Sequence, residues 1–269
     1  TLKEIELIKP NSILISALQL KMQQKSYFEA LTNKKITALG FEFIKDSEGA
    51  FPAVRQLSEI AGTASIQIAA EIMSITNQGN GLLLGNISGV PPTEVVVIGA
   101  GIVGEFAAKS ALGLGANVKV FDSSISKLRT LQANVGQRIY TSTMQPKNLM
   151  KALMRCDVAV GATKGKNRAP ILVNEAMVES MKQGAVIIDV SIDMGGCFET
   201  SELTTHDNPT FEKHGVIHYC VPNIPARYSR TSSVSLSNIF TSYLLQIAEA
   251  GGLENAIRQD HGLKNGLYV

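Results

Sequence analysis

A glycine motif directly after a short apolar run constrains the fold of this chain more than any other feature. Residues 95–98 (VVVI) predict a buried strand, and Gly99, Gly101 and Gly104 follow in the pattern GxGxxG at the start of a helix predicted at 104–114. In this order, strand, turn and helix form the loop that binds the pyrophosphate of a dinucleotide. The first glycine permits the tight turn, the second lets the backbone approach the phosphates, and the third lets the helix pack closely on the strand.

An acidic residue follows at the spacing that such a site requires. A second strand is predicted at 117–121 and ends at Asp122, 23 positions after Gly99. A carboxylate there can accept hydrogen bonds from the adenosine ribose and repels a 2′-phosphate, so NAD is favoured over NADP. The alternative is an ordinary strand, turn and helix in which Asp122 only caps the helix that follows.

Strands and helices alternate regularly after the glycine motif. Further strands are predicted at 157–160, 185–190 and 216–221, with helices predicted between strands at 126–134, 146–155 and 175–182. This alternation indicates a parallel, doubly wound sheet. The predicted fold class is therefore α/β, a Rossmann domain joined to part of a second α/β domain that would bind the substrate.

The beginning of the chain has a less complete pattern. Residues 12–16 and 35–41 predict two strands, and residues 23–33 predict a helix between them. This βαβ unit is half of a doubly wound sheet and leaves a sheet face and an edge uncovered. Because the chain also starts at Thr1 on an amphipathic stretch, we expect it to be a fragment or to be completed by a partner chain.

Two long helices are predicted to connect these parts. One is expected at 58–76 with Ser58 as N-cap, and the other at 231–250 with Ser232 as N-cap and two glycines at its end. The predicted organisation is a partial substrate domain at 1–57, a Rossmann NAD-binding domain with the interdomain helix at 58–227, and a helix that returns to the substrate domain at 228–269.

A second group of polar residues is predicted at the carboxyl end of the sheet. Asp193 follows a predicted strand and precedes two glycines, where it could position a reacting group or carry a proton. Asn223 follows the last predicted strand at the same edge and suits a carboxamide or a ribose hydroxyl. The alternatives are a loop aspartate that binds local backbone amides and a turn asparagine between two prolines.

Charge and cysteine content exclude several partners. The chain has 25 Lys and Arg against 23 Asp and Glu, a net charge of +2, which gives no basis for binding nucleic acid or a membrane surface. No apolar run reaches the roughly 18 residues of a membrane span. Three scattered cysteines do not form a disulfide framework, so we expect a cytoplasmic protein.

Metal and thiol chemistry have no support in the spacing of candidate residues. His206, His214, His218 and Cys220 match no familiar zinc pattern. Cys197 and Cys220 have no adjacent base and no CxxC partner. We therefore expect no metal site and no nucleophilic cysteine.

Three longer segments carry a family resemblance. GAGIVGEFAAKSALGLGANVKVFD, IIDVSIDMGGCFETSELTTHDNPTF and HGVIHYCVPNIPARYSRTSS resemble bacterial alanine dehydrogenases and the related NAD-binding subunit of proton-translocating transhydrogenase. The resemblance covers nearly the whole chain. It implies the reversible conversion of L-alanine, NAD⁺ and water to pyruvate, ammonia and NADH, with alanine and pyruvate as small-molecule substrates and a homo-oligomer, usually a hexamer, as the assembly.

The resemblance also assigns individual residues. Asp193 matches the catalytic aspartate of the family. The cofactor contacts that the resemblance and the glycine motif imply are Ser58, Gly99, Gly101, Val103, Gly104, Asp122, Lys127, Val190, Ser191, Ile192, Asp193, Val221, Asn223 and Ile224.

The chain departs from the family pattern in three respects. The family's catalytic histidine, and the lysine and arginine that hold the pyruvate carboxylate, belong to an N-terminal segment that precedes the part matched here, so we expect this chain alone to be inactive. Glu202 stands where the family often has arginine, which reverses a charge near the cofactor region. Ile224 replaces a frequent methionine.

Other functions remain open at this stage. A transhydrogenase domain would pass the hydride to a second protein, although residues 43–57 do not resemble the mobile loop of that family. A catalytically silent NAD(H)-binding module that senses redox state is an alternative from a different class. Saccharopine-type dehydrogenases are more distant enzyme relatives.

Overall fold

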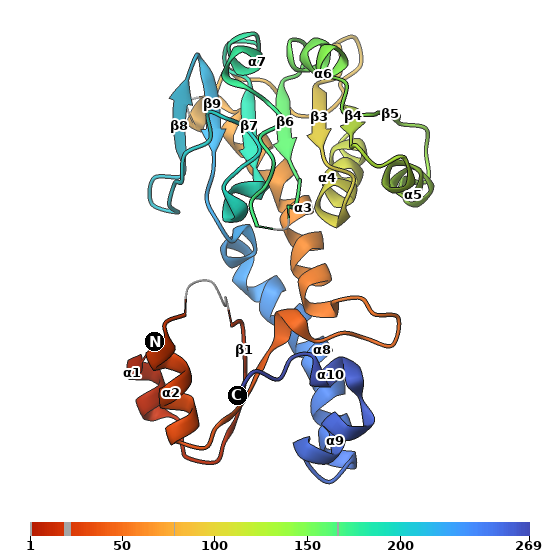
Figure 1. Cartoon of the computed structure of the whole chain (residues 1–269). Helices are drawn as coiled ribbons and strands as arrows, with labels where there is room; N and C mark the ends of the chain where they lie inside the picture. Colours follow the sequence, from red (N-terminus) through yellow and green to blue (C-terminus); the bar gives the residue numbers. More distant parts are fainter. Residues whose placement is uncertain (1, 19–22, 78, 166) are drawn as a thin grey trace. The chain divides into compact units, whose positions relative to one another are not determined.

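The computed structural model describes residues 2–18, 23–77, 79–165 and 167–269. The chain divides into two compact units (Figure 1). Unit 1 comprises Thr1–Leu57 and Arg230–Val269, and unit 2 comprises Ser58–Ser229. The functional roles that the sequence assigns to its three segments stay predictions.

Unit 2 is built on a sheet with the strand order β5-β4-β3-β6-β7-β9-β8. All neighbours pair in parallel except β8, which is antiparallel to β9. β3 and β6 are neighbours at the position where the strand order reverses direction. The predicted doubly wound, Rossmann-like α/β fold is therefore confirmed. The strands are β3 (Glu94–Ile98), β4 (Asn117–Phe121), β5 (Tyr140–Ser142), β6 (Val158–Gly161), β7 (Val186–Asp189), β8 (Thr210–Lys213) and β9 (Val216–Tyr219).

Two apolar clusters cover the opposite faces of this sheet. Along β3, Val95 and Val97 belong to one cluster and Val96 and Ile98 to the other, as the alternation of side chains along a strand requires. Burial on both faces explains why the central strands are continuous apolar runs. The first cluster includes buried residues of α3 (Pro52–Ile72), α4 (Ile102–Gly113) and α5 (Ile125–Val135), and the second those of α6 (Pro146–Leu153) and α7 (Glu175–Glu179).

The two edge strands are absent from the sequence prediction. β5 and β8 have three and four residues, and neither contains a fully buried side chain. Edge strands that lie half exposed lack the continuous apolar run by which the inner strands are recognised. Two predicted strands are also too long, because β7 ends at Asp189 and β9 ends at Tyr219. A short 3₁₀ segment, η4 (Val190–Met194), directly follows β7, and another, η5 (Ile224–Tyr228), follows β9 after residues 220–223.

Unit 1 contains the predicted βαβ unit, with a parallel β1–β2 pair. The last residues of the chain run beside β2: Ala38 N–H donates to Val269 O (N···O 2.8 Å), and Tyr268 N–H donates to Ala38 O (3.0 Å). The edge that we expected to be uncovered is therefore paired in part by the chain's own last residues. The elements are α1 (Leu2–Leu7), β1 (Ile13–Ser16), α2 (Lys25–Asn33), β2 (Thr37–Gly40), η2 (Phe41–Phe43), α8 (Ser229–Glu249), α9 (Leu253–Gln259) and α10 (His261–Lys264).

Both predicted serine caps are wrong. α3 begins at Pro52, so Ser58 lies in its second turn; proline suits the first turn of a helix, where its missing N–H costs nothing. α8 begins at Ser229, and Ser232 is a buried residue inside the helix. The predicted glycine end of α8 is confirmed. Gly251 has φ +75°, and Gly252 N–H donates to Ile247 O (2.9 Å), the bond that closes a Schellman motif.

Candidate functional site

The glycine motif forms a tight connection between β3 and α4. Gly99 has φ +114°, and a Cβ there would overlap the carbonyl oxygen of Ala162 after β6. A Cβ on Gly104 would overlap the carbonyl oxygen of Gly99. Among the residues that the structure describes, no atom lies within 4 Å of a Cβ built on Gly101. Gly99 and Gly104 are thus required by packing, whereas Gly101 leaves free space beside the backbone.

The start of α4 fits a phosphate group. The first N–H groups of a helix have no partner within the helix, and the N-cap residue Gly101 has no side chain that could bind them. The positive end of the helix dipole adds to the attraction for an anion. This helix end lies where the strand order reverses between β3 and β6, the position at which open α/β sheets bind ligands. The residues present therefore fit a pyrophosphate.

Asp122 joins the end of β4 to the glycine motif. Ala100 N–H donates to its Oδ2 (2.7 Å), and Ser124 N–H donates to its Oδ1 (2.7 Å). The N-cap of α5 is Ser124, whose Oγ accepts from Lys127 N–H (3.3 Å), so Asp122 is not the helix cap. A carboxylate has about four lone-pair sites, and two amide bonds leave sites for ribose hydroxyls. The Lys127 side chain is exposed.

A buried carboxylate, Asp189, ends β7 and binds the segment that follows. Its oxygens accept from the backbone N–H groups of Ser191 (3.0 Å) and Cys197 (2.9 Å) and from the hydroxyl of Ser201 (2.7 Å). Burial raises the pKa of Asp189, and these hydrogen bonds oppose the rise. Asp189 is not among the site residues predicted from the sequence, although an acid at the end of the apolar run VII is a recognisable signal.

Asp193 and Asn223, 30 positions apart, meet at the carboxyl edge of the sheet. Asn223 has φ +54°, and its N–H donates to Oδ1 of Asp193 (3.1 Å). Asp193 is exposed, yet the protein atoms around it desolvate the carboxyl and raise its pKa, against the effect of the Asn223 N–H. A carboxyl with a raised pKa at such an edge can hold or release a proton closer to neutral pH.

The neighbouring predicted residues differ in what they can offer a ligand. Ser191 is buried, and its Oγ accepts from Thr163 N–H (2.9 Å), which ties the segment after β7 to the segment after β6. Ile192, Val221 and Ile224 have buried side chains, so only their backbone groups can face a ligand. Val103 and Val190 are half-buried, and Ser58 is half-buried in the part of α3 that belongs to unit 2.

His218, Cys156 and Cys220 are buried side chains of unit 2. His218 is buried, with Nδ1 2.9 Å from Val216 O and Nε2 2.8 Å from Thr200 Oγ1. Because a carbonyl only accepts, Nδ1 carries the proton, and burial lowers the pKa of the imidazole. Burial also raises the pKa of Cys156 and of Cys220 to about 12. Within the described part of the chain, no group of three or more His, Cys, Asp and Glu is placed to hold a metal.

No helix among the described residues combines the length and the hydropathy needed to cross a membrane.

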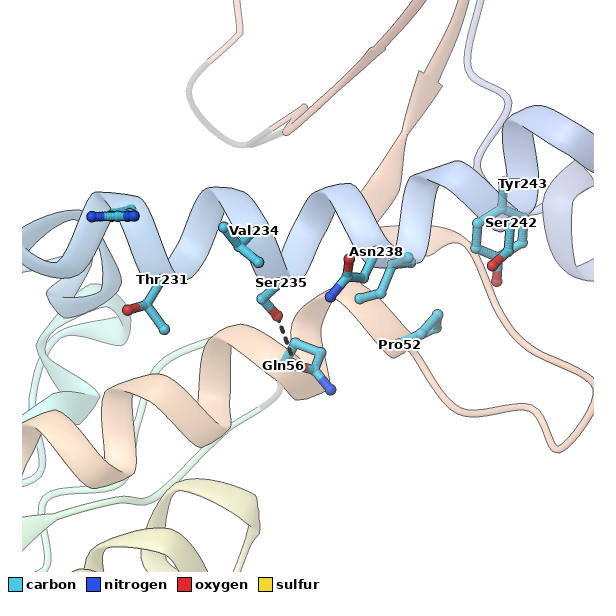
Figure 2. A pocket seen from close by; sticks show the side chains of 10 residues that line it. Pro52, Gln56, Thr231, Val234, Ser235, Asn238, Ser242 and Tyr243 are labelled. Carbon is cyan, nitrogen blue, oxygen red and sulfur yellow. Dashed lines mark hydrogen bonds between the residues drawn. The ribbon is translucent and has the colours of Figure 1, made fainter.

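A groove of about 770 Å³ lies within unit 1, between the first turns of α3 and one face of α8 (Figure 2). Ser235 Oγ donates to Gln56 Oε1 (2.6 Å) across it. The groove contains none of the residues expected to contact a dinucleotide. It is lined by Pro52, Gln56, Arg230, Thr231, Val234, Ser235, Asn238, Ile239, Ser242 and Tyr243.

Comparison with known proteins identifies relatives over nearly the whole length of the chain. The family profile "Alanine dehydrogenase/PNT, C-terminal domain" matches residues 65–269. An alanine dehydrogenase of Methanococcus maripaludis is 42% identical over 266 residues, which are 98% of this chain and 71% of that protein. An alanine dehydrogenase of Mycolicibacterium smegmatis is 42% identical over 240 residues, 89% of this chain and 64% of that protein.

Solved structures agree with this result. The structure of an L-alanine dehydrogenase matches with a TM-score of 0.92 and 35% identity, over 99% of this chain and 73% of that one. A transhydrogenase structure from Sinorhizobium meliloti matches with a TM-score of 0.77 and 21% identity, over 91% of this chain and 70% of that one. The second match concerns the fold alone.

Proposed function

The chain belongs to the alanine dehydrogenase/PNT family. We propose that the protein catalyses the reversible, NAD-dependent oxidative deamination of L-alanine to pyruvate and ammonia. One observation carries the proposal. In a chain 42% identical to an alanine dehydrogenase, the start of α4, which fits a phosphate group, and the Asp193–Asn223 pair lie at the same edge of one sheet. A dinucleotide bound along that edge would contact both.

Family and fold imply a nicotinamide cofactor, and we propose NAD in particular. The N–H groups at the start of α4 would hold the pyrophosphate, with the open space beside Gly101 admitting it. Asp122 would accept the hydroxyls of the adenosine ribose on the lone pairs that its two amide bonds leave. The same carboxylate repels a 2′-phosphate. Lys127 would add a contact to the ribose, and Ser58 is a further proposed contact of NAD.

The segments after β7 and β9 would line the nicotinamide. Ser191, Ile192, Val221 and Ile224 are buried, so they would act through backbone groups and by excluding water. Val190 and Asn223 are more accessible. When bound, the cofactor accepts the hydride that leaves the Cα of the amino acid.

Asp193 is the proposed catalytic residue of this chain. Oxidation of an amine to an imine and hydrolysis of the imine require protons to move and a water molecule to be held near the Cα. The Asp193 carboxyl is anchored on one side by the Asn223 N–H and has a raised pKa, so it can hold that water and exchange a proton with it.

The test is an assay of the full-length protein with NAD and a panel of L-alanine, L-lysine and other amino acids, following NADH absorbance. Selective reduction of NAD with alanine is the expected result. Reduction with lysine alone, or tight NADH binding without turnover of any amino acid, contradicts the proposal. A titration with NADH and NADPH checks the cofactor separately, and a preference for NADPH contradicts the role of Asp122.

We also propose a homo-oligomer in the cytoplasm. The resemblance to a family of homo-hexamers supports the assembly, and three free, buried cysteines agree with a reducing compartment. Light scattering of the full-length protein measures the assembly, and a monomer at micromolar concentration contradicts it.

A further inference from the structure

We propose that Asp189 is a positioning residue that holds the segment bearing Asp193 in its reactive geometry; the inference rests on the function proposed above. Asp189 is the last residue of β7, and none of its side-chain surface is exposed. It lies beside Cys197 and Phe198, which belong to one of the two apolar clusters of unit 2. A carboxyl group in such surroundings is retained only where its oxygens are fully hydrogen-bonded.

The donors come from both ends of the segment that carries Asp193. Ser191 N–H at its beginning donates to Oδ1, whereas Cys197 N–H and the Ser201 hydroxyl at its end donate to Oδ2. Phe198 N–H adds a longer contact of 3.4 Å to the same oxygen. One side chain therefore closes the whole segment 191–201 into a loop.

The surrounding backbone leaves room for this carboxylate at two glycines. A Cβ on Gly161 of β6 would lie 2.7 Å from Asp189 Oδ1, and a Cβ on Gly196 would lie 2.8 Å from Oδ2. Gly196 and its neighbour Gly195 also have left-handed backbone conformations, with φ of +75° and +89°. The carboxylate and the path of the loop are thus fitted to each other on both sides.

Hydrogen bonds within the loop connect Ser191, which binds Asp189, to Asp193 two residues later. Gly195 N–H donates to Ile192 O (2.8 Å), and Gly196 N–H donates to Ser191 O (3.1 Å), so Asp193 lies within a tight hydrogen-bonded turn. Ser191 is at once a donor to Asp189 and the acceptor of Thr163 N–H. A displacement of Ser191 therefore moves Asp193 away from the Asn223 N–H that orients it.

Asp157 provides a matched control. It is also a buried aspartate of unit 2, and it accepts from Glu94 N–H (2.8 Å) and from Lys182 Nζ (2.7 Å). It precedes β6, whereas Asp189 ends the parallel strand β7, so the two carboxylates lie at opposite edges of the sheet. Replacing either one disturbs a buried carboxylate of the same unit, but only Asp189 contacts the segment of Asp193.

The experiment compares Asp189→Asn and Asp157→Asn in the full-length protein. In Asp189→Asn, an NH₂ group replaces one of the two acceptor oxygens. This group faces N–H or O–H donors and cannot accept their hydrogen bonds, so the substitution should release the loop. A misplacement on the order of 1 Å lowers turnover about 100-fold, so we expect kcat to fall by that factor. The Kd for NADH should change less than kcat, because the proposed pyrophosphate and ribose contacts at α4 and Asp122 do not involve Asp189. Amide hydrogen exchange in residues 191–201 should accelerate. Asp157→Asn should leave kcat and the exchange of this segment unchanged, whatever it does to overall stability.

Ser201 keeps the inference testable if Asp189→Asn does not fold. Ser201→Ala removes one donor to Asp189 and should lower kcat severalfold, whereas Ser201→Thr keeps the hydroxyl and should restore it. A wild-type kcat in Asp189→Asn, or an equal loss of kcat in Asp189→Asn and Asp157→Asn, overturns the inference alone. If the wild-type protein itself does not oxidise alanine, the proposed function is overturned and the inference with it.

Discussion

Units 1 and 2 are both α/β structures, but they bury their sheets in different ways. In unit 2 a seven-stranded sheet is covered on both faces by two large apolar clusters, and its central strands are almost wholly buried. Unit 1 has one parallel pair of strands and two smaller clusters, one built around Ile5, Leu31 and Ala38 and the other around Leu39, Ile247 and Leu263.

The difference explains where reactive groups can be placed. A sheet buried on both faces has little freedom, so loops that leave its carboxyl edge start from fixed positions. Asp122 directly follows β4, Asp189 is the last residue of β7, and Asp193 lies in η4, which directly follows β7. Unit 1 has a smaller buried sheet and depends more on individual contacts, such as the one between the Tyr27 and Tyr268 hydroxyls (3.1 Å). We therefore expect substitutions in unit 2 to change binding and turnover, and substitutions in unit 1 to change local stability.

The largest effect is expected from Asp193→Asn. An amide cannot exchange a proton in this role, and loss of general acid–base catalysis lowers kcat about 10²- to 10⁴-fold. The Kd for NADH should change by less than a few-fold, because the fold and the glycine motif are untouched. Steady-state kinetics with alanine and NAD measure the first quantity, and nicotinamide fluorescence the second. Near-wild-type turnover removes Asp193 from the mechanism.

Gly101→Ala should weaken NADH binding without loss of stability. Its Cβ meets no described protein atom within 4 Å and would occupy the space proposed for the pyrophosphate. Loss of close approach to the phosphates should raise the Kd about 10- to 100-fold, which corresponds to roughly 1.4–2.8 kcal/mol. Fluorescence titration gives the Kd, and thermal unfolding gives the stability.

Gly113→Ala is the matched control for this substitution. Gly113 is the last residue of the same helix, α4, and its added Cβ also meets no described atom within 4 Å. It should leave the Kd for NADH unchanged. Equal effects of Gly101→Ala and Gly113→Ala would mean that the space beside Gly101 is not where the phosphates bind.

Tyr268→Ala tests the dependence of unit 1 on its last residues. The ring packs edge-on against Phe28 (centroids 6.1 Å apart), and the hydroxyl contacts Tyr27. Truncation of a half-buried aromatic side chain should destabilise unit 1 by about 1–2 kcal/mol, less than the 3–5 kcal/mol of a fully buried ring. Amide exchange should accelerate in β2 and leave unit 2 unchanged. Tyr140→Ala on the edge strand β5, where half of the side chain is exposed, is the control and should have a smaller effect.

The smallest effect is expected in the pH dependence of the free energy of unfolding of unit 2. Because burial lowers the pKa of His218, the unfolded chain binds a proton at a higher pH than the folded one. Stability from this group is present above the unfolded pKa of about 6.5 and is lost as the pH falls through it toward the folded pKa. The slope should be at most about 1.4 kcal/mol per pH unit. Denaturant unfolding between pH 7.5 and 5 measures it, and a slope that persists in His218→Gln contradicts the assignment.

The features of unit 2 that could be predicted from the sequence are those with a local signature. The run VVVI, the three glycines and Asp122 each have a local signature, and the strands, the turn and the helix lie close to the predicted positions. β5 and β8 were missed because short edge strands have no such run. The residue type of Ser58 and Ser232 suits a cap and predicts one, but α3 already begins at Pro52 and α8 at Ser229.

The proposed site was predicted only in part, and for a physical reason. Asp193 and Asn223 follow predicted strands, so their proximity could be inferred from the parallel topology. Asp189 was not selected, because its importance depends on donors as distant as Ser201, twelve positions later in the chain. The burial of Val221 and Ile224 likewise depends on tertiary packing, and no local pattern distinguishes a side chain that faces a ligand from one that faces the core.

The pairing of β2 with the last residues of the chain sets an order for folding. Unit 2 is a continuous stretch, Ser58–Ser229, so it can fold on the ribosome as soon as that stretch has emerged. Unit 1 combines residues from both sides of it, and Ala38 meets Val269 only after the whole of unit 2 has been synthesised. Contacts of such long sequence separation form slowly. During synthesis the edge of β2 that pairs with Tyr268 and Val269 therefore lacks this partner until these residues have emerged.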